Sequence, residues 1–401
     1  MYVGSELAVG SGVEPDERNR RDLLRRNEIC TRFFSQEAQR LAEASREMSR
    51  RFLAGGRLLA FGRGPAATDA QHVSVEFVHP VIVGKRALPA VDLGADFTAR
   101  IPLIVRPDDM VMGFAAAVPD LEVDQALALA RERGALTFAF PGESADYAFA
   151  PPDADPFITQ EVFEILYHLL WETVHVYFEH REQGHDVGAS AFLYPFLGKQ
   201  EQELDSVMIQ VQQSMTQKVE EVNSMRAVAA ESEAHVMTEA AAAINGRLDQ
   251  GGTILTFGNG GSATDANDLA LDCSVPPPGL KSLPAMSLSS EPAIITAITN
   301  DIGAEATFSR QVCAHAGHND TAIAISTSGN SPNILSGLVE ARKRGLLTVA
   351  FAGYDGGRVR TEKLADHVIV VHSDYIPRIQ EVQASIYHVL LRRIAEMQSE
   401  E

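Results

Sequence analysis

Residues 323–335 read IAISTSGNSPNIL, and this stretch sets the expectation for the fold. The apolar run at 321–325 predicts a buried strand, and a helical pattern at 333–344 follows the turn directly. A strand that ends in a glycine turn and opens a helix forms an anion pocket, because free backbone N–H groups and the helix dipole favour negative charge there. The predicted phosphate donors in this turn are the hydroxyls of Ser326, Thr327, Ser328 and Ser331.

A second glycine-rich turn supports phosphate binding over the simpler alternative, in which Ser and Asn only cap a helix. GNGGS at 258–262 follows a strand-like run at 253–257 and precedes another helical pattern. The turns after neighbouring parallel strands meet at the carboxyl edge of the sheet, where such sheets bind ligands. Neither turn has the Gly-Lys-Ser/Thr spacing of a Walker loop.

The two turns together carry a family resemblance. GNGGSATDA at 258–266, followed by ISTSGNSPN at 325–333, resembles the SIS (sugar isomerase) fold, and most closely the phosphoheptose isomerases, which act on sedoheptulose 7-phosphate. The resemblance covers nearly all of the chain. It implies a phosphorylated sugar as substrate, contacted by Asn259, Gly260, Ser262, Asp301 and Gln380 together with the four hydroxyl residues above. Asp301 follows a run at 294–298 that looks like a strand.

The chain also contains an internal repeat. GRGPAATDA at 62–70 matches GNGGSATDA at an offset of 196 residues, and QEV at 160–162 matches QEV at 380–382 at an offset of 220. We therefore expect an α/β protein of two tandem SIS domains, each a parallel-sheet three-layer α/β/α sandwich. The expected boundaries are 17–180 for the first domain, 181–199 for a linker and 200–400 for the second domain.

Composition narrows the class of partner. The chain has 401 residues and a net charge of 34 − 54 = −20, which argues against nucleic acid as a partner but not against a small anionic substrate. Its three cysteines show no metal-binding spacing, and we expect a reducing, cytoplasmic location. No apolar run reaches the roughly 18 residues that would indicate a membrane span.

The two copies differ in their phosphate chemistry. At an offset of 211, the hydroxyl-rich turn falls on 115–120, which reads AAAVPD and has no hydroxyl. Asp120 would repel a phosphate, and Pro119 removes a backbone N–H. At the other turn, Ser262 corresponds to Ala66. We expect only the C-terminal copy to bind phosphate.

The candidate metal ligands, in contrast, are more complete in the N-terminal copy than in the C-terminal copy. His72 and Glu76 lie four residues apart, on one face of a predicted helix, and this pairing suits a divalent metal such as Zn²⁺. The resemblance implies that the N-terminal copy binds zinc through His72, Glu76, Gln160 and His168. The simpler alternatives are a surface helix pair and a satisfied core histidine. In the C-terminal copy, Asp268 and Asp272 replace the first pair, whereas Gln380 and His388 remain.

The resemblance implies an aldose–ketose isomerase that works through an enediol, with acid and base candidates Glu76, His168, Asp272 and His388. The family forms homotetramers, so this tandem chain is expected to form a homodimer that mimics one. One alternative is a non-catalytic sugar-phosphate sensor or scaffold, because the copy with the intact phosphate turn lacks the His/Glu pair. Another is an isomerase for a different ketose phosphate, because Phe157 and Pro377 replace a substrate-binding aspartate of the family.

Overall fold

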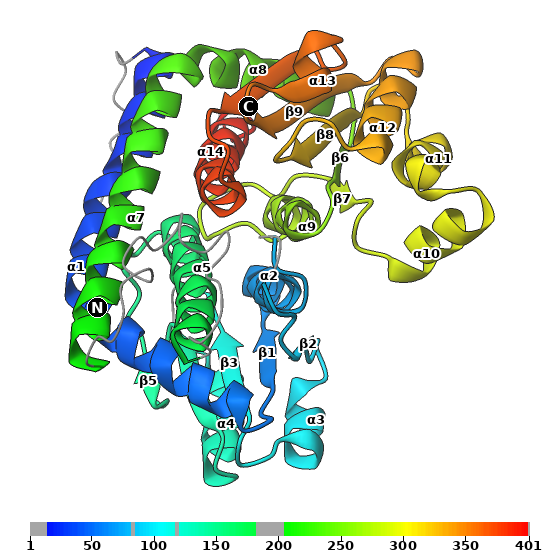
Figure 1. The fold of residues 1–401 in the computed structure, drawn as a ribbon. Coiled ribbons are helices and arrows are strands. Elements are labelled where there is room, and N and C mark those ends of the chain that lie inside the picture. Colours follow the sequence, from blue (N-terminus) through cyan, green and yellow to red (C-terminus); the bar gives the residue numbers. More distant parts are fainter. Residues whose placement is uncertain (1–13, 82–84, 117–119, 182–203, 400–401) are drawn as a thin grey trace.

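The computed structural model describes residues 14–81, 85–116, 120–181 and 204–399. It contains two five-stranded sheets, ordered β2-β1-β3-β4-β5 and β7-β6-β8-β9-β10 (Figure 1). All strand pairs are parallel, and the two sheets repeat one topology. The expected α/β architecture of two tandem parallel-sheet domains is confirmed. The two strands that precede the glycine-rich turns of the C-terminal copy are neighbours, as the sequence predicts.

The N-terminal copy begins with one long helix. Its elements are α1 (Pro15–Leu53), β1 (Leu58–Gly62), a 3-10 turn (Gly64–Ala66), α2 (Ala67–Val78), β2 (Ala90–Asp92), α3 (Phe97–Ile104), β3 (Met110–Phe114), α4 (Leu121–Glu132), β4 (Leu136–Phe140), β5 (Tyr147–Ala148) and α5 (Pro156–Arg181).

The C-terminal copy repeats this order, but its first helix is divided in two, two helices lie between β7 and β8, and a short helix follows β9. Its elements are α7 (Leu204–Ser232), α8 (Ala234–Leu248), β6 (Ile254–Phe257), α9 (Gly261–Ser274), β7 (Ala285–Ser287), α10 (Pro292–Asp301), a 3-10 turn (Ala304–Ala306), α11 (Thr307–His315), β8 (Thr321–Ser326), α12 (Pro332–Lys343), β9 (Leu347–Gly353), α13 (Gly357–Thr361), β10 (His367–Val371) and α14 (Ile376–Met397).

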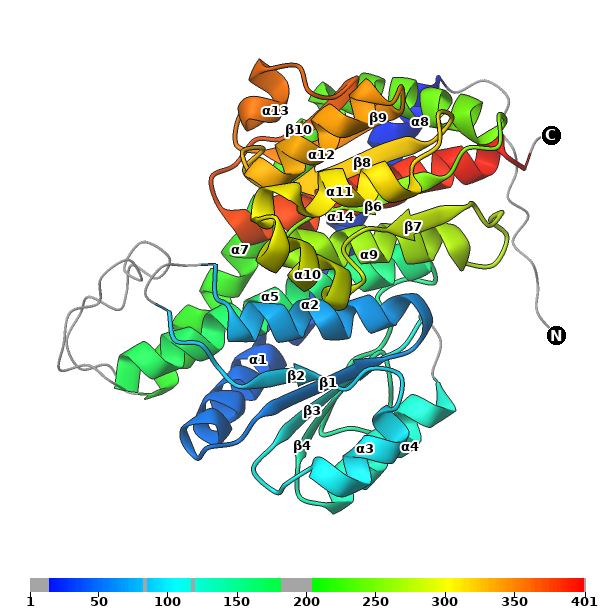
Figure 2. The ribbon, with the colours of Figure 1, turned by 90° about the vertical axis from the view of Figure 1, so that its right-hand side faces the viewer.

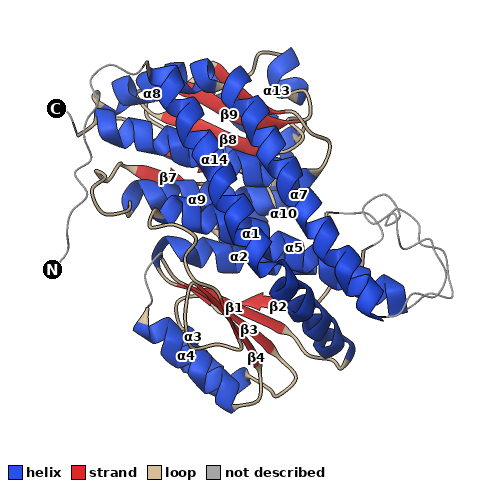
Figure 3. Cartoon of the chain, turned by 90° about the vertical axis from the view of Figure 1, so that its left-hand side faces the viewer, coloured by secondary structure: helices blue, strands red, loops and turns tan. Residues whose placement is uncertain are grey.

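Both faces of each sheet are covered, which explains the continuous apolar runs of the strands. In β1, Leu58 and Ala60 point to the inner face, and Leu59 and Phe61 to the outer face. The outer faces are covered by α3 and α4 in one copy and by α11, α12 and α13 in the other. The inner faces of both copies share one core, to which α1, α2, α5, α7, α8, α9 and α14 contribute (Figures 2 and 3).

Equivalent residues of the two copies meet across an approximate two-fold axis. The Asn267 amide donates to Gln71 Oε1 at 3.0 Å, and these positions differ by the repeat offset of 196. Asn27 and Asn223, separated by the same offset, bond through side chain and backbone between α1 and α7. Helices α2 and α9 pack together between the two sheets (Figure 1). Equivalent positions therefore face each other, so α2 and α9 run antiparallel.

The structure corrects one sequence prediction. The run at 294–298 belongs to helix α10, because Pro292 occupies its first turn and the Glu291 carboxylate accepts from the Ala293 N–H as an N-cap. Most of the predicted linker, 182–199, lies outside the described residues. Within the part of the chain that is described, no helix is long and apolar enough to cross a bilayer.

Candidate functional site

The hydroxyl-rich turn joins the end of β8 to the start of α12. Ser326 Oγ accepts from the Gly329 N–H at 3.1 Å, and Ser328 Oγ accepts from the Asn330 N–H at 3.2 Å. Both hydroxyls use their oxygens within the loop, so their protons can be donated to a ligand. Ser331 is the N-cap residue of α12, yet its hydroxyl makes no capping bond. The turn therefore has the donors that a phosphate requires, at a helix N-terminus.

Close backbone packing fixes the shape of this turn. Gly329 has φ +62°, and a Cβ there would lie 2.4 Å from the Gly356 carbonyl oxygen, so only glycine fits. The turn is also tied to the first glycine-rich turn, because the side chains of Asn259 and Asn333 exchange two hydrogen bonds, at 2.8 and 3.0 Å. The two turns after β6 and β8 are thus hydrogen-bonded to each other, and we call them the loop pair.

The corresponding turn of the N-terminal copy has a different role. Asp120 caps α4 by accepting from the N–H groups of Glu122 and Val123. The carboxylates of Asp120 and Glu122 also pair with Arg63, at 3.6 and 2.5 Å. Pro119 lies outside the described residues. In the described part of this turn, a carboxylate occupies the helix N-terminus, which fits the expectation that this copy does not bind phosphate there.

Because α2 and α9 pack antiparallel, His72 of the N-terminal copy lies beside the glycine-rich turn at 258–262 of the C-terminal copy. A Cβ at Gly261, the first residue of α9, would lie 3.0 Å from His72 Nε2 and 2.0 Å from the Gln380 amide nitrogen. The glycine is therefore required for this close approach. At the opposite end, Thr68 near the start of α2 donates to Asp268 at 2.7 Å. At each end of this helix pair, residues of both copies thus come together in one buried cluster.

The first composite site, which we call the His72 site, contains His72 and Glu76 of α2, Glu164 and His168 of α5, Asp265 of α9, and Gln380 and Glu381 of α14. His72 Nε2 lies 3.4 Å from His168 Nε2, 3.8 Å from Glu76 Oε1 and 3.5 Å from the Gln380 amide nitrogen. The other ring nitrogens contact carboxylates of the second copy: His72 Nδ1 with Asp265 at 3.3 Å, and His168 Nδ1 with Glu381 at 2.9 Å.

A buried ion-pair chain supports Glu381. The guanidinium of Arg378 bonds to Glu381 and, at 2.7 Å, to Glu172 of α5. Lys218 of α7 pairs with the same Glu172. Burial alone would raise the pKa of Glu172, but Arg378 and Lys218 lower it to about 2. These linked ion pairs hold Glu381 in place and, through it, fix the orientation of the His168 ring.

Several buried oxygens of the His72 site have no hydrogen-bond partner. They are Glu76 Oε2, Glu164 Oε1, Asp265 Oδ2, Gln380 Oε1 and Glu381 Oε2. Glu164, Asp265 and His72 line a cavity of about 10 Å³, room for about one water molecule or ion. Uncompensated buried carboxylates are costly unless a cation pairs with them. Two imidazoles, carboxylates and an amide oxygen are a donor set that suits a divalent metal such as zinc.

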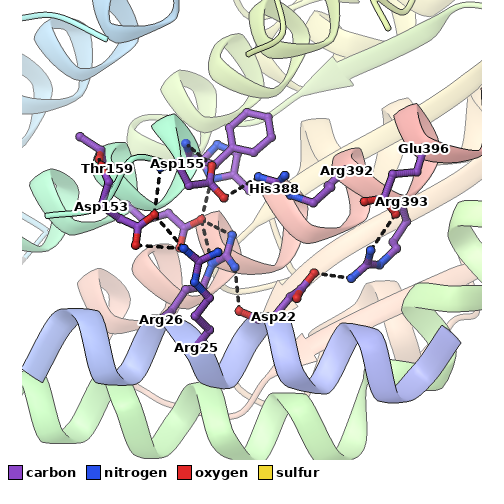
Figure 4. A network of polar contacts seen from close by, with 12 residues as sticks. Asp22, Arg25, Arg26, Asp153, Asp155, Thr159, His388, Arg392, Arg393 and Glu396 are labelled. Atoms are coloured by element: carbon purple, nitrogen blue, oxygen red, sulfur yellow. Dashed lines mark hydrogen bonds and ion pairs between the residues drawn. The ribbon is translucent and has the colours of Figure 1, made fainter. Parts of the chain in front are cut away.

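The second composite site, which we call the His388 site, contains Asp268 and Asp272 of α9, His388 of α14, and Gln160 and Glu161 of α5. His388 Nε2 lies 3.1 Å from Asp272 Oδ2, and His388 Nδ1 lies 3.0 Å from Glu161 Oε1. Glu161 is paired in turn with Arg26 of α1 at 2.7 Å. Figure 4 shows His388 beside this network, which connects α1 to α14.

The His388 site satisfies its own charges. Asp268 accepts from Thr68, Gln160 and Tyr387, each within 2.8 Å. Among the described side chains of this site, no buried polar atom lacks a partner. Burial would lower the pKa of His388, but bonds to Asp268, Asp272 and Glu161 raise it well above its ordinary value. The result is a charged histidine held among carboxylates.

Carboxyl groups in both sites have perturbed acidity. Burial raises the pKa of Glu76, and it raises that of Glu164 well above the ordinary value. In the His388 site, burial and the neighbouring Asp268 raise the pKa of Asp272 to about 7. Raised carboxyl pKa values are typical of groups that take up and release protons near neutral pH.

The sequence predicted that His72, Glu76, Gln160 and His168 of the N-terminal copy would form one site. In the structure, each site takes its residues from both copies. His72, Glu76 and His168 come together, but Gln380 of the other copy lies beside them, while Gln160 donates to Asp268 at 2.7 Å. Asp272 and His388 form the second site. Asn259, Gly260, Ser262 and the four hydroxyl residues form the loop pair. Asp301 lies exposed at the end of α10, paired with its neighbour Asn300, and does not join the buried cluster.

Sequence reasoning missed Glu164, Asp265, Glu381, Glu161 and the tyrosines Tyr167 and Tyr387. Glu164 could have been noticed as the one carboxylate within the largely apolar helical run 162–170, which also contains His168. Glu161 and Glu381 follow the repeated glutamines directly and are repeated themselves. Their partners are histidines of the opposite copy, and that pairing is visible only in the tertiary structure.

Comparisons with known proteins agree with this architecture. The SIS domain family model matches residues 219–353. The phosphoheptose isomerase of Solidesulfovibrio magneticus is 41% identical over 182 residues, which are 44% of this chain and 85% of that protein. The phosphoheptose isomerase of Nitratiruptor is 45% identical over 144 residues, 36% of this chain and 76% of that protein.

Solved structures match the tandem arrangement. Tagatose-6-phosphate ketose/aldose isomerase from Escherichia coli aligns with 100% of this chain and 96% of its own, at 14% identity and a TM-score of 0.56. The C-terminal domain of glucosamine-fructose-6-phosphate aminotransferase from Francisella tularensis covers 98% of both chains, at 10% identity and a TM-score of 0.58. At these identities the likeness concerns the fold alone. The curated relatives, two tandem SIS sheets and an intact SIS loop pair together show that this chain belongs to the SIS-domain family that includes the phosphoheptose isomerases.

Proposed function

We propose that the protein is an aldose–ketose isomerase for a phosphorylated sugar, with sedoheptulose 7-phosphate as the substrate and a heptose 7-phosphate as the product. We further propose that each chain has one working site, the His72 site, and that the His388 site is structural. The relatives at 41–45% identity support the reaction class, and their name, phosphoheptose isomerase, makes the heptulose phosphate the sugar that we propose.

One observation carries the proposal: the position of Gly261 against His72 and Gln380. It joins the hydroxyl-rich loop of the C-terminal copy to the histidine and glutamate pair of the N-terminal copy. The substitutions that remove the His/Glu pair and the phosphate hydroxyls then both fall on the other composite site. The His388 site has Asp268 and Asp272 in place of the pair, and its neighbouring turn has Asp120 at the helix N-terminus.

In the proposed reaction, the loop pair holds the phosphate through Ser326, Thr327, Ser328 and Ser331 and the N–H groups at the start of α12. This binding anchors the sugar, so that its carbonyl end has a fixed position in the His72 site. Glu76 removes the proton from the hydroxyl-bearing carbon beside the carbonyl and returns it to the carbonyl carbon. The hydroxyl proton passes meanwhile to the former carbonyl oxygen, and the two transfers together convert ketose to aldose through an enediol. The buried carboxyl of Glu76 has a raised pKa, which makes it a stronger base than an exposed glutamate.

We propose that the His72 site holds zinc. His72 and His168 supply nitrogen donors, and Gln380 presents an amide oxygen once its side-chain amide turns over. A bound divalent cation stabilises negative charge on the enediolate oxygens. The protein's own contribution is orientation: Asp265 and Glu381 hold the two imidazole rings so that both Nε2 atoms face the same point.

The sensor alternative depended on the absence of a His/Glu pair beside the intact loop. In the folded chain the pair stands beside that loop, because it comes from the other copy. This removes the reason that favoured a non-catalytic role. An isomerase for another ketose phosphate differs only in the sugar and is separated by the same assay.

The test is turnover by the purified chain after chelation, with and without added Zn²⁺, using sedoheptulose 7-phosphate and shorter ketose phosphates. We expect zinc-dependent aldose formation that is fastest with the heptulose. Phosphosugar binding without turnover of any of these sugars would overturn the proposal. The homodimer and the cytoplasmic location stay predictions, to be tested by mass in solution and by cell fractionation.

A further inference from the structure

The two histidines of the His72 site point their Nε2 atoms at each other. His72 Nδ1 and His168 Nδ1 each contact a carboxylate, and a carboxylate accepts a hydrogen bond, so in the neutral form that ligates a metal each ring carries its proton on Nδ1. Both Nε2 atoms are then acceptors, and they face each other at 3.4 Å. Two donors at about 2.1 Å from a tetrahedral metal ion are roughly 3.4 Å apart. The two Nε2 atoms therefore have the separation expected of two ligands of one cation.

A third donor lies in place beside this pair. Glu164 precedes His168 by one helical turn on α5, and its carboxylate lies within 4.8 Å of the ligand atoms of both histidines. The side chain is 4% exposed, and its Oε1 has no partner. A buried, unpartnered carboxylate oxygen beside two converging lone pairs indicates a position for a cation.

Glu164 is not part of the repeat. The corresponding residue of the C-terminal copy is Ala384, although Gln160, Glu161 and His168 all have identical counterparts, at Gln380, Glu381 and His388. The helix therefore does not need a carboxylate at this position in order to pack. The acid occurs only in the copy whose histidine faces His72, which associates it with that site.

Glu76 has a different geometry. Its Oε1 lies 3.8 Å from His72 Nε2. Among the described residues, two groups of three donors have ligand atoms within 4.8 Å of one another, and Glu76 belongs to neither; they are His72 with Glu164 and His168, and Asp268 with Asp272 and His388. We infer that Glu164, with His72 and His168, is the carboxylate ligand of the divalent cation, and that Glu76 remains free to carry protons. This inference refines the metal part of the proposed function, because it separates two roles that the family resemblance gives to Glu76.

The experiment uses the full chain, stripped with chelator and titrated with Co²⁺, whose visible spectrum reports the ligands bound directly to it. Affinity for Zn²⁺ is measured in parallel by competition with a chelating dye. Glu164→Gln removes the ligand charge with little change of shape. Asp69→Asn is the matched control, because Asp69 is buried in the same cavity wall but lies outside the donor group. Glu76→Gln tests the separation of roles.

We expect wild type to bind one Co²⁺ per chain. Glu164→Gln should change the spectrum and lower Zn²⁺ affinity by at least 10- to 100-fold. Glu76→Gln and Asp69→Asn should keep the spectrum and lose less Zn²⁺ affinity than Glu164→Gln. Glu164→Ala, which copies the residue found at position 384, serves if the glutamine variant does not fold.

Three outcomes would overturn the inference: no metal bound by wild type, an unchanged spectrum in Glu164→Gln, or an equal loss of affinity in Asp69→Asn, which would indicate a general charge effect. The measurement needs no substrate. Its result is therefore independent of whether sedoheptulose 7-phosphate is turned over, so the ligand assignment and the proposed reaction can fail separately.

Discussion

His168 Nδ1 of the N-terminal copy lies 2.9 Å from Glu381 Oε1 of the C-terminal copy, and the contact is repeated in reverse at 3.0 Å between His388 and Glu161. Each copy thus orients the histidine of the other. Both contacts are buried, and both carboxylates are supported by arginines, Arg378 and Arg26 respectively. The two copies cannot be assigned separate sites, because neither site is complete within one copy.

Loss of a loop hydroxyl should weaken substrate binding. Ser328→Ala removes a donor from the intact turn, so KM for the phosphosugar should rise by about 10-fold, the size of one hydrogen bond to a charged group, while kcat changes less. Steady-state kinetics measures both constants. Ser336→Ala, farther along the same helix, is the control and should change neither. A fall in kcat alone for Ser328→Ala would place this residue at the reacting carbons instead.

Adding one methyl group at Gly261 should separate the loop from the His72 site. Its Cβ would lie 2.0 Å from the Gln380 amide nitrogen, so Gln380 must move. We expect Gly261→Ala to lower kcat/KM by about 100-fold or more, the scale of a misplaced active-site group. Gly246→Ala is the matched change in α8, where a Cβ meets nothing within 4 Å. It should stabilise the protein by about 0.5–1 kcal/mol and keep full activity. Equal activities in the two variants would contradict the close approach.

The His388 site should matter for stability. His388→Asn leaves Glu161 and Asp272 without their shared partner in a buried environment, which typically costs about 3–5 kcal/mol. Thermal or denaturant unfolding should show this loss, while kcat of the folded protein stays within a few-fold of wild type. A large drop in kcat at unchanged stability would move His388 into the catalytic machinery.

The same site should make stability depend on pH. Asp272 has a pKa of about 7 in the folded chain and about 4 when unfolded, so the folded state binds the extra proton between these values. Its stabilising contribution is therefore complete below about pH 4 and is lost as pH rises through 7. The raised pKa of His388 acts in the same direction, at higher pH.

Asp272→Asn should remove the contribution of Asp272 to the pH dependence of stability. Melting temperature measured from pH 5 to pH 8 should fall more steeply for wild type than for Asp272→Asn. The same experiment on Asp320→Asn, a carboxylate outside both sites, should retain the wild-type slope. Parallel curves for wild type and Asp272→Asn would show that Asp272 does not hold the proton.

Much of the fold was readable from particular residues. The two glycine turns after apolar runs predicted neighbouring parallel strands, and β6 and β8 are paired in this way. The run at 294–298 was predicted as a strand, because short apolar runs do not distinguish strand from helix. Glu291 and Pro292, the N-cap and first helical residue of α10, were the signals for a helix.

The site was predictable only in part. Spacing on single helices indicated His72 with Glu76, but it could not show that α2 runs antiparallel to α9 and that Gln380 therefore lies beside His72 in place of Gln160. Such a pairing depends on tertiary packing between segments about 300 residues apart in the chain. Glu164 was not predicted as a site residue, because the family resemblance gives that position no role.

The most direct test of the central claim compares Glu76→Gln with Asp272→Asn in a single assay of sedoheptulose 7-phosphate turnover, with folding checked by circular dichroism. These residues occupy equivalent positions in the two copies, and each variant replaces one buried carboxylate by its amide. If only the His72 site works, Glu76→Gln should lose at least about 100-fold in kcat, the range for a general base, and Asp272→Asn should keep most of it. Loss of turnover in Asp272→Asn with activity retained in Glu76→Gln would contradict the account.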